Sequence, residues 1–206
     1  MSETPVRAAL RAATGEIHAR LHGLPALAAL AAGQLDRAAY AALLRRFLGF
    51  HRGAEAALGA APDLAPWGIR LAERQRAWLI EADLAALGVD AGEMGLAALP
   101  PLGSAARALG CLYVTEGSTL GGRHLARALD GLLPPGEAGR RFLLGHGPRH
   151  AALWRECCDA LERCGADPER RAAMLEAAAG TFAAFAAWFG APGPVPQGMA
   201  LPPAGG

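Results

Sequence analysis

Apolar residues recur every three or four positions along most of the chain, which is the period of an α-helix. The first such stretch runs to His22, where Gly23 follows and ends it. We expect Thr4 to be its N-cap and Pro5 its first helical residue, because both residue types favour these positions. Its apolar stripe comprises Leu10, Ala13, Ile17 and Leu21.

The same period predicts further helices, separated by short loops rich in glycine and proline. Asp36 and Asp167 each precede a periodic stretch and are expected to be N-caps. In the stretch 67–87 we expect Leu71, Trp78 and Leu79 to be buried. The predicted segments cover residues 24–32, 36–58, 67–87, 104–129, 142–144, 149–163 and 168–189.

Domain organisation follows from the spacing of these segments, since no loop is long enough to be a linker and no repeat is present. We therefore expect one helical domain over residues 1–189. Residues 190–206 are rich in proline and glycine and predict a flexible tail.

Composition supports helices over strands. The chain has 50 alanines and 31 leucines but only 7 valines and isoleucines together. β-sheets depend on β-branched residues, whereas alanine and leucine lose least on entering a helix. The fold class indicated is all-α.

Charge and cysteine content exclude several functional classes. Twenty basic residues, all arginine, balance nineteen acidic ones, so no global positive field indicates nucleic-acid binding. No apolar run reaches the roughly 20 residues of a membrane span, and the N-terminus lacks a secretion signal. We therefore expect a cytoplasmic protein, with unpaired thiols at Cys111, Cys157, Cys158 and Cys164.

Three glycines interrupt the predicted helix 104–129, at Gly117, Gly121 and Gly122. Each mid-helix glycine costs about 1 kcal/mol relative to alanine, so such a cluster is typical of a functional site. A surface without side chains would let a flat ligand approach the backbone. Close helix packing, or a turn between two helices, explains the same residues equally well.

His18 is the most informative histidine. Thr14 lies one turn before it, and Arg11 lies seven residues before it, about 10 Å away along the same helix face. An imidazole and a cation at this separation would suit a haem, with iron on the histidine and a propionate on the arginine. The simpler interpretation is a half-buried histidine without a ligand.

Other histidines carry weaker signals. His22, four residues after His18, could form a two-histidine metal face, although no third ligand stands at a convincing spacing. His51, His146 and His150 are interpreted as structural or exposed. Motifs of di-iron bundles, serine hydrolases, phosphate loops and dinucleotide-binding folds are absent from the sequence.

Together these segments resemble the haem oxygenase family, in particular its bacterial, biliverdin-producing members. LRAATGEIHARLH resembles the proximal helix with its Ala-Thr-x-x-x-His pattern, and LYVTEGSTLGGRHLARAL resembles the distal helix with its Gly-x-x-x-Gly-Gly signature. GQLDRAAYAALLRRFLGFH is similar to the second helix. The last helix, with Phe182 and Phe189, resembles the helix that helps to wall the pocket.

The resemblance implies roles for residues on the proximal side. His18 would be the iron ligand, next to Thr14 of the motif, and Arg11 would bind a haem propionate where relatives usually have lysine. Tyr113 occupies a position that in some bacterial relatives also touches a propionate, and Phe182 would contact the cofactor.

On the distal side the resemblance implies a catalytic surface formed by Gly117, Ser118, Gly121 and Gly122. Animal members have an aspartate where this chain has Ser118, and that aspartate orders the water network for oxygen activation. Many bacterial relatives lack it too. The network is therefore expected to be built from other residues.

The implied fold is a single-domain bundle that holds haem between a proximal helix and a glycine-kinked distal helix. The implied reaction is the oxidative cleavage of haem, both substrate and cofactor, to biliverdin, carbon monoxide and ferrous iron. It would use O2 and electrons from a ferredoxin or an NAD(P)H-dependent reductase, and a bilin-binding photoreceptor could receive the product. Nucleic acid and membrane are not expected partners.

Three alternatives remain open at this point. A haem-binding or haem-trafficking protein could use the same scaffold without catalysis. A helical relative of the thiaminase or cofactor-biosynthesis type would share the architecture without haem. A helical interaction domain would explain the composition but not the glycine cluster.

Overall fold

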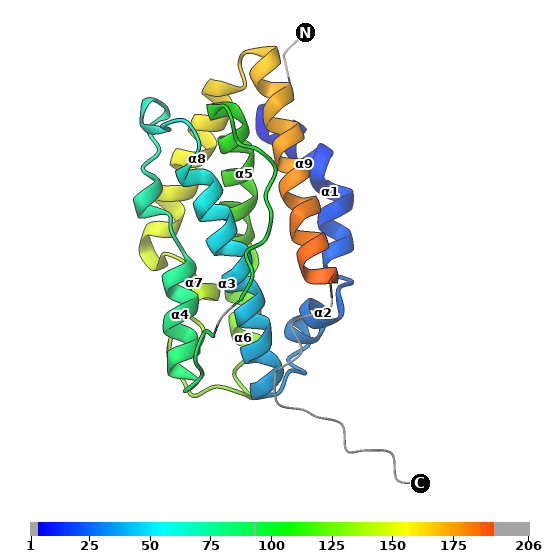
Figure 1. The fold of residues 1–206 in the computed structure, drawn as a ribbon, viewed down its shortest axis with the longest axis vertical. Coiled ribbons are helices and arrows are strands. Elements are labelled where there is room, and N and C mark those ends of the chain that lie inside the picture. The colour runs from blue at the N-terminus through cyan, green and yellow to red at the C-terminus, as the bar shows by residue number, and fades with distance from the viewer. Residues whose placement is uncertain (1–3, 93, 192–206) are drawn as a thin grey trace.

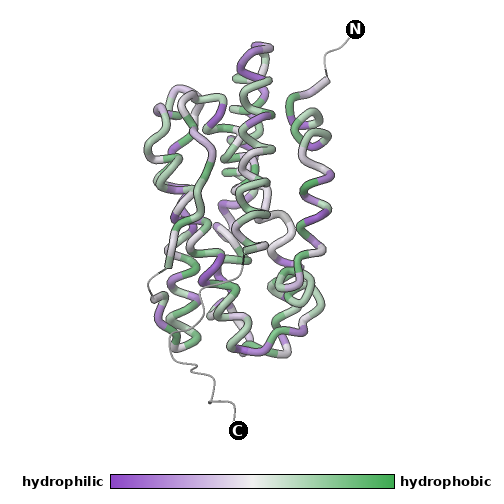
Figure 2. Tube along the Cα trace, turned by 45° about the vertical axis from the view of Figure 1, so that its right-hand side comes forward, coloured by the Kyte–Doolittle hydropathy of each residue, from purple (hydrophilic) through white to green (hydrophobic). Residues whose placement is uncertain are grey.

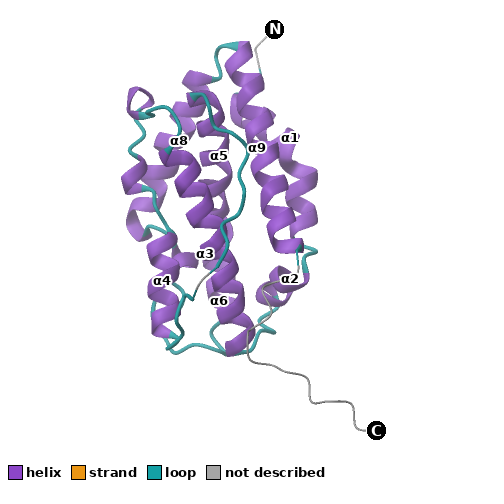
Figure 3. Ribbon diagram, in the orientation of Figure 1, coloured by secondary structure: helices purple, strands orange, loops and turns teal. Residues whose placement is uncertain are grey.

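The structure is a computed structural model that describes residues 4–92 and 94–191. Within these ranges the regular elements are helices, and strands are absent, which confirms the expected fold class (Figures 1 and 3). Four short 3₁₀ turns join or interrupt the α-helices: η1 (Ala65–Trp67), η2 (Leu71–Glu73), η3 (Ser118–Gly121) and η4 (Gly147–Arg149). The α-helices are α1 (Val6–Leu21), α2 (Pro25–Ala31), α3 (Arg37–Gly59), α4 (Ala77–Ala86), α5 (Ala105–Gly117), α6 (Gly122–Ala128), α7 (Arg141–Leu144), α8 (His150–Cys164) and α9 (Pro168–Gly190).

Helix α5 lies at the centre of the bundle and packs against α8 and α9. Helix α1 lies beside α9, and α3 pairs with α4 (Figure 1). Apolar and polar residues alternate along the helices, as expected of elements with one buried side (Figure 2). One core cluster surrounds α5 and α8, and a second lies between α3, α4 and the segment from α6 to α7.

Two predicted N-caps are confirmed. The side chain of Asp36 accepts a hydrogen bond from the backbone N–H of Ala39 at 2.7 Å, at the start of α3. The side chain of Asp167 accepts one from the N–H of Arg170 at 2.8 Å, at the start of α9. A carboxylate at this position satisfies an otherwise unpaired donor of the first turn, so both starts were readable from sequence.

The predicted start of α1 was wrong by one residue and in its cap. Pro5 rather than Thr4 is the N-cap, and no side-chain cap forms there. The first amides of α1 instead reach the neighbouring helix α8, where the Glu162 carboxylate accepts from Val6 N at 2.8 Å and Arg7 N at 3.1 Å. A tertiary acceptor therefore replaces the local cap.

The long helix predicted over residues 67–87 was also wrong. Gly68 has φ +78°, a left-handed conformation that ends η1, and only the later part of the segment forms α4. Leu79 is buried as expected, but Leu71 is only partly buried and Trp78 is 58% exposed. The irregular stretch before α4 allows two arginine side chains to enter the interior, as described below.

The stretch 104–129 is divided at its glycines. Helix α5 ends at Gly117, the tighter turn η3 covers residues 118–121, and α6 starts at Gly122. A 3₁₀ turn within a helical path often marks a functional or strained position. The predicted kink is thus present as a change of helix type.

Helix α9 ends at Gly190, one residue beyond the expected boundary, and most of the predicted tail lies outside the described residues. Of the described helices, α9 is the one long and apolar enough to cross a membrane by length and composition. It packs within the bundle, with Met174, Ala177, Ala178 and Thr181 buried.

Candidate functional site

Two cavities meet beside the last turns of α1. We call the first the apolar chamber, with a volume of about 500 Å³, and the second the outer cavity, with about 770 Å³. His18, Val114 and Phe182 line both of them. Volumes of this size are typical of sites for cofactors and small molecules.

The apolar chamber is lined by residues of α1, α2, α3, α5, η3, α6, α7 and α9. Phenylalanines from three elements gather on its inner side, with Phe50 and Phe185 stacked edge to face at 4.8 Å between ring centroids. Such a lining excludes water and offers flat surfaces to an aromatic ligand. Its apolar lining residues are Leu21, Leu27, Leu30, Ala31, Phe47, Phe50, Val114, Leu125, Phe142, Phe182 and Phe185.

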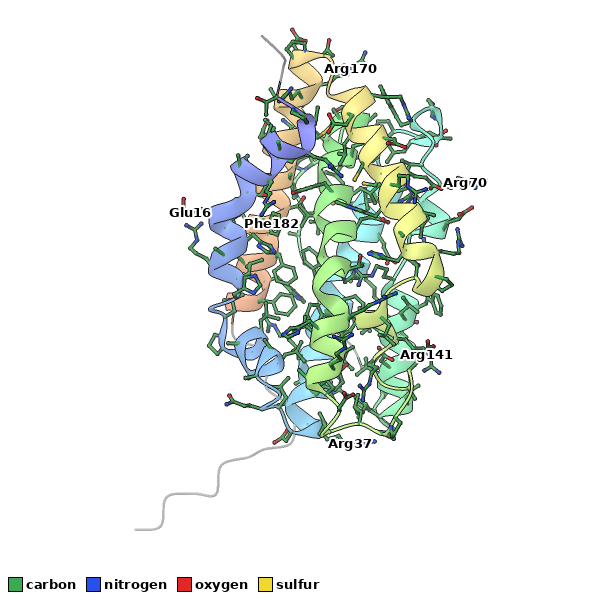
Figure 4. All side chains as sticks on the ribbon, turned by 180° about the vertical axis from the view of Figure 1, so that it is seen from behind. Glu16, Arg37, Arg70, Arg141, Arg170 and Phe182 are labelled. Atoms are coloured by element: carbon green, nitrogen blue, oxygen red, sulfur yellow. The ribbon has the colours of Figure 1, made fainter. Side chains whose placement is uncertain are left out.

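His18 stands at the junction of the two cavities. Its ring lies edge to face with Phe182 of α9, at 5.7 Å between centroids. Phe182 reaches from α9 into the space between α1 and α5, whereas Glu16 points outward from α1 (Figure 4). Burial, together with the nearby His22, lowers the pKa of His18, so that a neutral imidazole with a free lone pair is favoured.

The glycines of the predicted distal surface divide into two kinds. A Cβ added at Gly121 would meet nothing within 4 Å, and both Gly121 and Ser118 line the apolar chamber. Gly117 lines the outer cavity, where its added Cβ would lie 3.5 Å from the Trp154 ring. Gly117, Gly121 and Ser118 therefore face the space in which a ligand could lie.

Gly122 does not belong to that surface, contrary to the sequence-based expectation. It is buried and lines neither cavity, and an added Cβ would overlap the carbonyl oxygen of Leu143. Its glycine is needed because α6 and α7 approach each other closely. The packing alternative, which the sequence left open, is correct for this one residue.

The outer cavity carries the positive charge of the site. Arg7 and Arg11 of α1 line it together with Thr14, Tyr113 and Trp154. Burial raises the pKa of Tyr113, and a hydrogen bond with Thr14 and the charge of Arg11 oppose the rise. Two guanidinium groups and a phenol at the mouth of an apolar pocket suit a ligand whose exposed end carries carboxylates.

Behind α5 lies a third and much smaller space, the polar chamber, of about 50 Å³. Residues from three separate segments line it, and His51 and Thr115 also line the apolar chamber. Its volume is enough for one or more water molecules. The polar groups around it are His51, Glu55, Arg74, Gln75, Arg76, Thr115 and Glu116.

Buried charges hold the distal segment against this polar chamber. Arg76, 3% exposed, donates to the carbonyl oxygen of Thr115 at 3.0 Å and to Ser118 Oγ at 3.1 Å. Arg74 pairs with the buried Glu116 at 3.1 Å and with the half-exposed Glu156 at 2.7 Å. Burial lowers the pKa of Arg76 to about 10, and raises that of Glu116 against the opposing charge of Arg74.

Buried polar atoms point to the function of the polar chamber. Within the described part of the chain, Arg74 Nε, Arg76 Nε and Glu116 Oε1 are buried without a hydrogen-bond partner in the protein. Such groups in a native protein normally bind ordered water or a ligand. Sequence reasoning missed these residues, because they are far apart in the chain and share no motif.

The other histidines lie at different places around the site. His51 is 4% exposed and lines both the apolar and the polar chamber, and burial lowers its pKa well below the usual value. His22 and His124 line the apolar chamber from opposite walls. His150 lies 2.9 Å from the hydroxyl of Thr119, outside that chamber.

No group of three or more histidine, cysteine or carboxylate side chains is arranged to hold a metal ion within residues 4–92 and 94–191. All four cysteines are buried free thiols, as the sequence predicts. The chemical donors of the site are therefore the His18 imidazole, the arginines of the outer cavity and the polar groups behind α5.

Comparison with known proteins agrees with this geometry. The family model described as "Heme oxygenase" matches residues 4–191. The chain belongs to the haem oxygenase family. A protein named "Heme oxygenase" from Xanthomonas campestris pv. campestris is 35% identical over 165 residues, which cover 77% of this chain and 91% of the relative. Family membership confirms the expectation of a haem-degrading enzyme.

Solved structures support the fold. The haem oxygenase of Neisseria meningitidis superposes with a TM-score of 0.71 at 24% identity, covering 96% of this chain and 99% of that one. The haem oxygenase of Leptospira interrogans gives 0.71 at 18% identity, with 90% and 98% covered. A haem oxygenase of the cyanobacterium Synechocystis, in complex with haem, gives 0.70 at 16% identity, with 91% of each chain covered.

Proposed function

We propose that this chain binds haem between His18 and the open face at Gly121, and cleaves it oxidatively to biliverdin, carbon monoxide and ferrous iron. The observation that carries this proposal is the apolar chamber itself. It has the His18 imidazole on one wall and, at Gly121 on the other, backbone without a side chain. The neighbouring outer cavity adds the cations that the two propionates of haem require.

The donor set of the site fits haem. A neutral imidazole is a good axial ligand, and the phenylalanines match the apolar faces of a porphyrin. Arg7, Arg11 and Tyr113 lie at the open end, where carboxylates could remain near water. Bound haem supplies the redox-active iron on which oxygen is reduced, with electrons from a partner protein.

The protein itself contributes position and shielding. His18 holds the ligand from α1, and Arg11 and Tyr113 fix its orientation through the propionates. The aromatic side of the chamber excludes water, which protects reactive oxygen species from side reactions. Gly121 has no side chain and so lets the macrocycle and small ligands approach the backbone of η3.

Proton delivery is assigned to the polar chamber. Ser118 Oγ donates to the Thr115 carbonyl oxygen at 2.7 Å and accepts from Arg76, so its hydroxyl is held at the chamber wall. Arg76 and the Glu116 carboxyl can hold water in the space behind it, with His51 and Thr115 at the boundary between the two chambers. This arrangement takes the role of the aspartate that animal members carry at the position of Ser118.

Partners and location follow from the reaction. A ferredoxin or an NAD(P)H-dependent reductase would supply the electrons, and a bilin-binding photoreceptor is one candidate recipient of the product. Four reduced, buried thiols are consistent with the cytoplasm as its location.

Aerobic reduction of the purified haem complex tests the proposal. Haem is titrated into the protein, and ascorbate or a reductase is then added while the absorption spectrum is recorded. We expect the Soret band to be replaced by a biliverdin spectrum, with carbon monoxide and ferrous iron released. A haem complex that is reduced but never degraded would contradict the proposal and indicate a haem carrier.

A further inference from the structure

His18 and His22 form a pair on the last turns of α1 that the proposed function uses only in part. The two rings are 5.0 Å apart between centroids and nearly perpendicular, at 85°. Both line the apolar chamber and both are exposed to it rather than packed in the core. Residues four apart on a helix are neighbours, and paired histidines at this spacing bind zinc in many enzymes.

The separation of the rings matches two ligands of one metal ion. A metal–nitrogen bond of about 2.0–2.1 Å places a ring centroid about 3.2 Å from the ion. Two such rings at a tetrahedral angle are then about 5.2 Å apart, and at a right angle about 4.5 Å. The observed 5.0 Å lies between these values.

We propose that His18 and His22 form a second metal site, which binds a bare divalent first-row ion when no haem is present. The identity of the physiological ion, ferrous iron left after the macrocycle is opened, rests on the proposed function. Water would fill the other positions, because no third histidine, cysteine or carboxylate joins the pair within the described residues. Imidazole is a suitable ligand for iron, cobalt, nickel and zinc.

The step itself needs only ligand exchange. The bonds between the ferrous ion and the biliverdin nitrogens would break, the two nitrogens that are anionic while bound to the metal would take up two protons from water, and the His22 imidazole would bind the ion beside His18. No electron moves in this step. Because His18 takes part in both sites, bound haem and a bare ion exclude each other.

Cobalt titration of the haem-free full-length protein tests this proposal. Co²⁺ is the probe because it binds imidazole sites more tightly than Fe²⁺ does and reports its coordination in the visible spectrum. We expect His18→Ala and His22→Ala each to weaken Co²⁺ binding at least about tenfold, since losing a direct ligand costs no less than losing an outer-shell partner. His124→Ala, which removes the exposed histidine of the opposite wall, is the matched control and should change the affinity less than twofold.

Haem titration of the same proteins separates this inference from the proposed function. His22→Ala should still bind haem, because His18 remains as the proposed iron ligand, and Co²⁺ should compete with haem less effectively in His22→Ala than in the wild type. Co²⁺ binding that is insensitive to both His18→Ala and His22→Ala would overturn the second site and leave the haem site intact. Pair-dependent Co²⁺ binding in a protein that takes up no haem would instead support the metal site and contradict the proposed function.

Discussion

The two walls of the apolar chamber are built in opposite ways. Helix α1, which carries His18, buries only Val6, Leu10, Thr14 and Leu21 among its sixteen residues. Helix α5, on the distal side, buries nine of its thirteen residues, including the charged Glu116. The proposed iron ligand, His18, therefore lies on a partly exposed helix. The distal wall of the chamber is formed in part by α5, the helix at the centre of the bundle.

The two walls also have different structural requirements. The proximal wall needs one imidazole and a few cations, which a single amphipathic helix can present. On the distal wall, the turn η3 must leave the space above Gly121 unfilled, although it lies next to the packed core. Two buried arginines from the irregular segment before α4 hold that turn in place. The contrast predicts that substitutions on α1 affect binding, whereas those behind α5 affect stability first.

The largest effect is expected for His18→Ala. Loss of the proposed ligand of the haem iron should lower haem affinity at least about a hundredfold and abolish turnover, because even outer-shell partners contribute tenfold to a hundredfold. The free energy of unfolding should change little, since the His18 side chain is exposed to the cavity. Absorption spectra during haem titration measure the first effect, and urea denaturation the second. Unchanged spectra in this variant would remove the assignment.

Arg74→Met is expected to lower the free energy of unfolding first, in contrast to His18→Ala. It leaves the carboxylate of Glu116, which is 5% exposed, buried without its charged partner. Removing one member of a buried ion pair costs about 3–5 kcal/mol. Glu156→Gln is the control, because Glu156 pairs with the same arginine but its side chain is 50% exposed, and its loss should cost less than about 1 kcal/mol. Equal losses for the two variants would contradict the buried scaffold.

Gly121 and Gly122 are neighbours in one motif, and their variants distinguish a ligand-facing position from a packing position. Gly122→Ala should destabilise the protein by about 1–3 kcal/mol, because the new methyl group meets the backbone of Leu143. In Gly121→Ala the new methyl group would lie in open space, so the free energy of unfolding should change by less than about 1 kcal/mol. The larger Gly121→Leu should fold and yet weaken haem binding or divert the reaction. Wild-type turnover by Gly121→Leu would argue against a close approach of haem to η3.

The pH dependence of stability is expected to be the smallest effect. The pKa of buried His51 is lowered in the folded state, so unfolding takes up a proton below the unfolded pKa of about 6.5. Its contribution to stability is present above that pH and is lost as the pH falls, by about 1.4 kcal/mol per pH unit at most. His146, with a pKa lowered to about 4, acts in the same direction, and Asp83, raised to about 6, opposes both.

Comparison of the wild type with His51→Leu isolates this contribution. Denaturant midpoints measured between pH 7.5 and 5.5 should fall less steeply in the variant. Parallel curves for the two proteins would show that His51 does not stay neutral in the folded protein.

Features that depend on local spacing could be predicted from the sequence, and features that depend on tertiary contacts could not. The all-helical class, the caps at Asp36 and Asp167, and the pairing of His18 with a glycine-rich helix depend on local spacing, and local spacing is visible in a sequence. The role of Gly122 could not be distinguished from that of Gly121, because only the approach of α7 separates them. The polar chamber depends on residues 51, 55, 74, 76, 115 and 116, which only the folded chain brings together.

The segment before α4 shows why the predicted helix over residues 67–87 failed. Its leucines and arginines have good helix propensity, but Arg74 and Arg76 find buried carbonyl and carboxylate acceptors elsewhere in the bundle. Tertiary bonds of this kind override a weak local preference. They also explain why the departure from a regular helix lies beside the functional site.

A crystal structure of the haem complex tests the central claim most directly. We predict iron bound to the His18 imidazole, the macrocycle in the apolar chamber over Gly121, and both propionates toward Arg7 and Arg11. Iron bound to another histidine, or a porphyrin lying wholly in the outer cavity, would contradict the account.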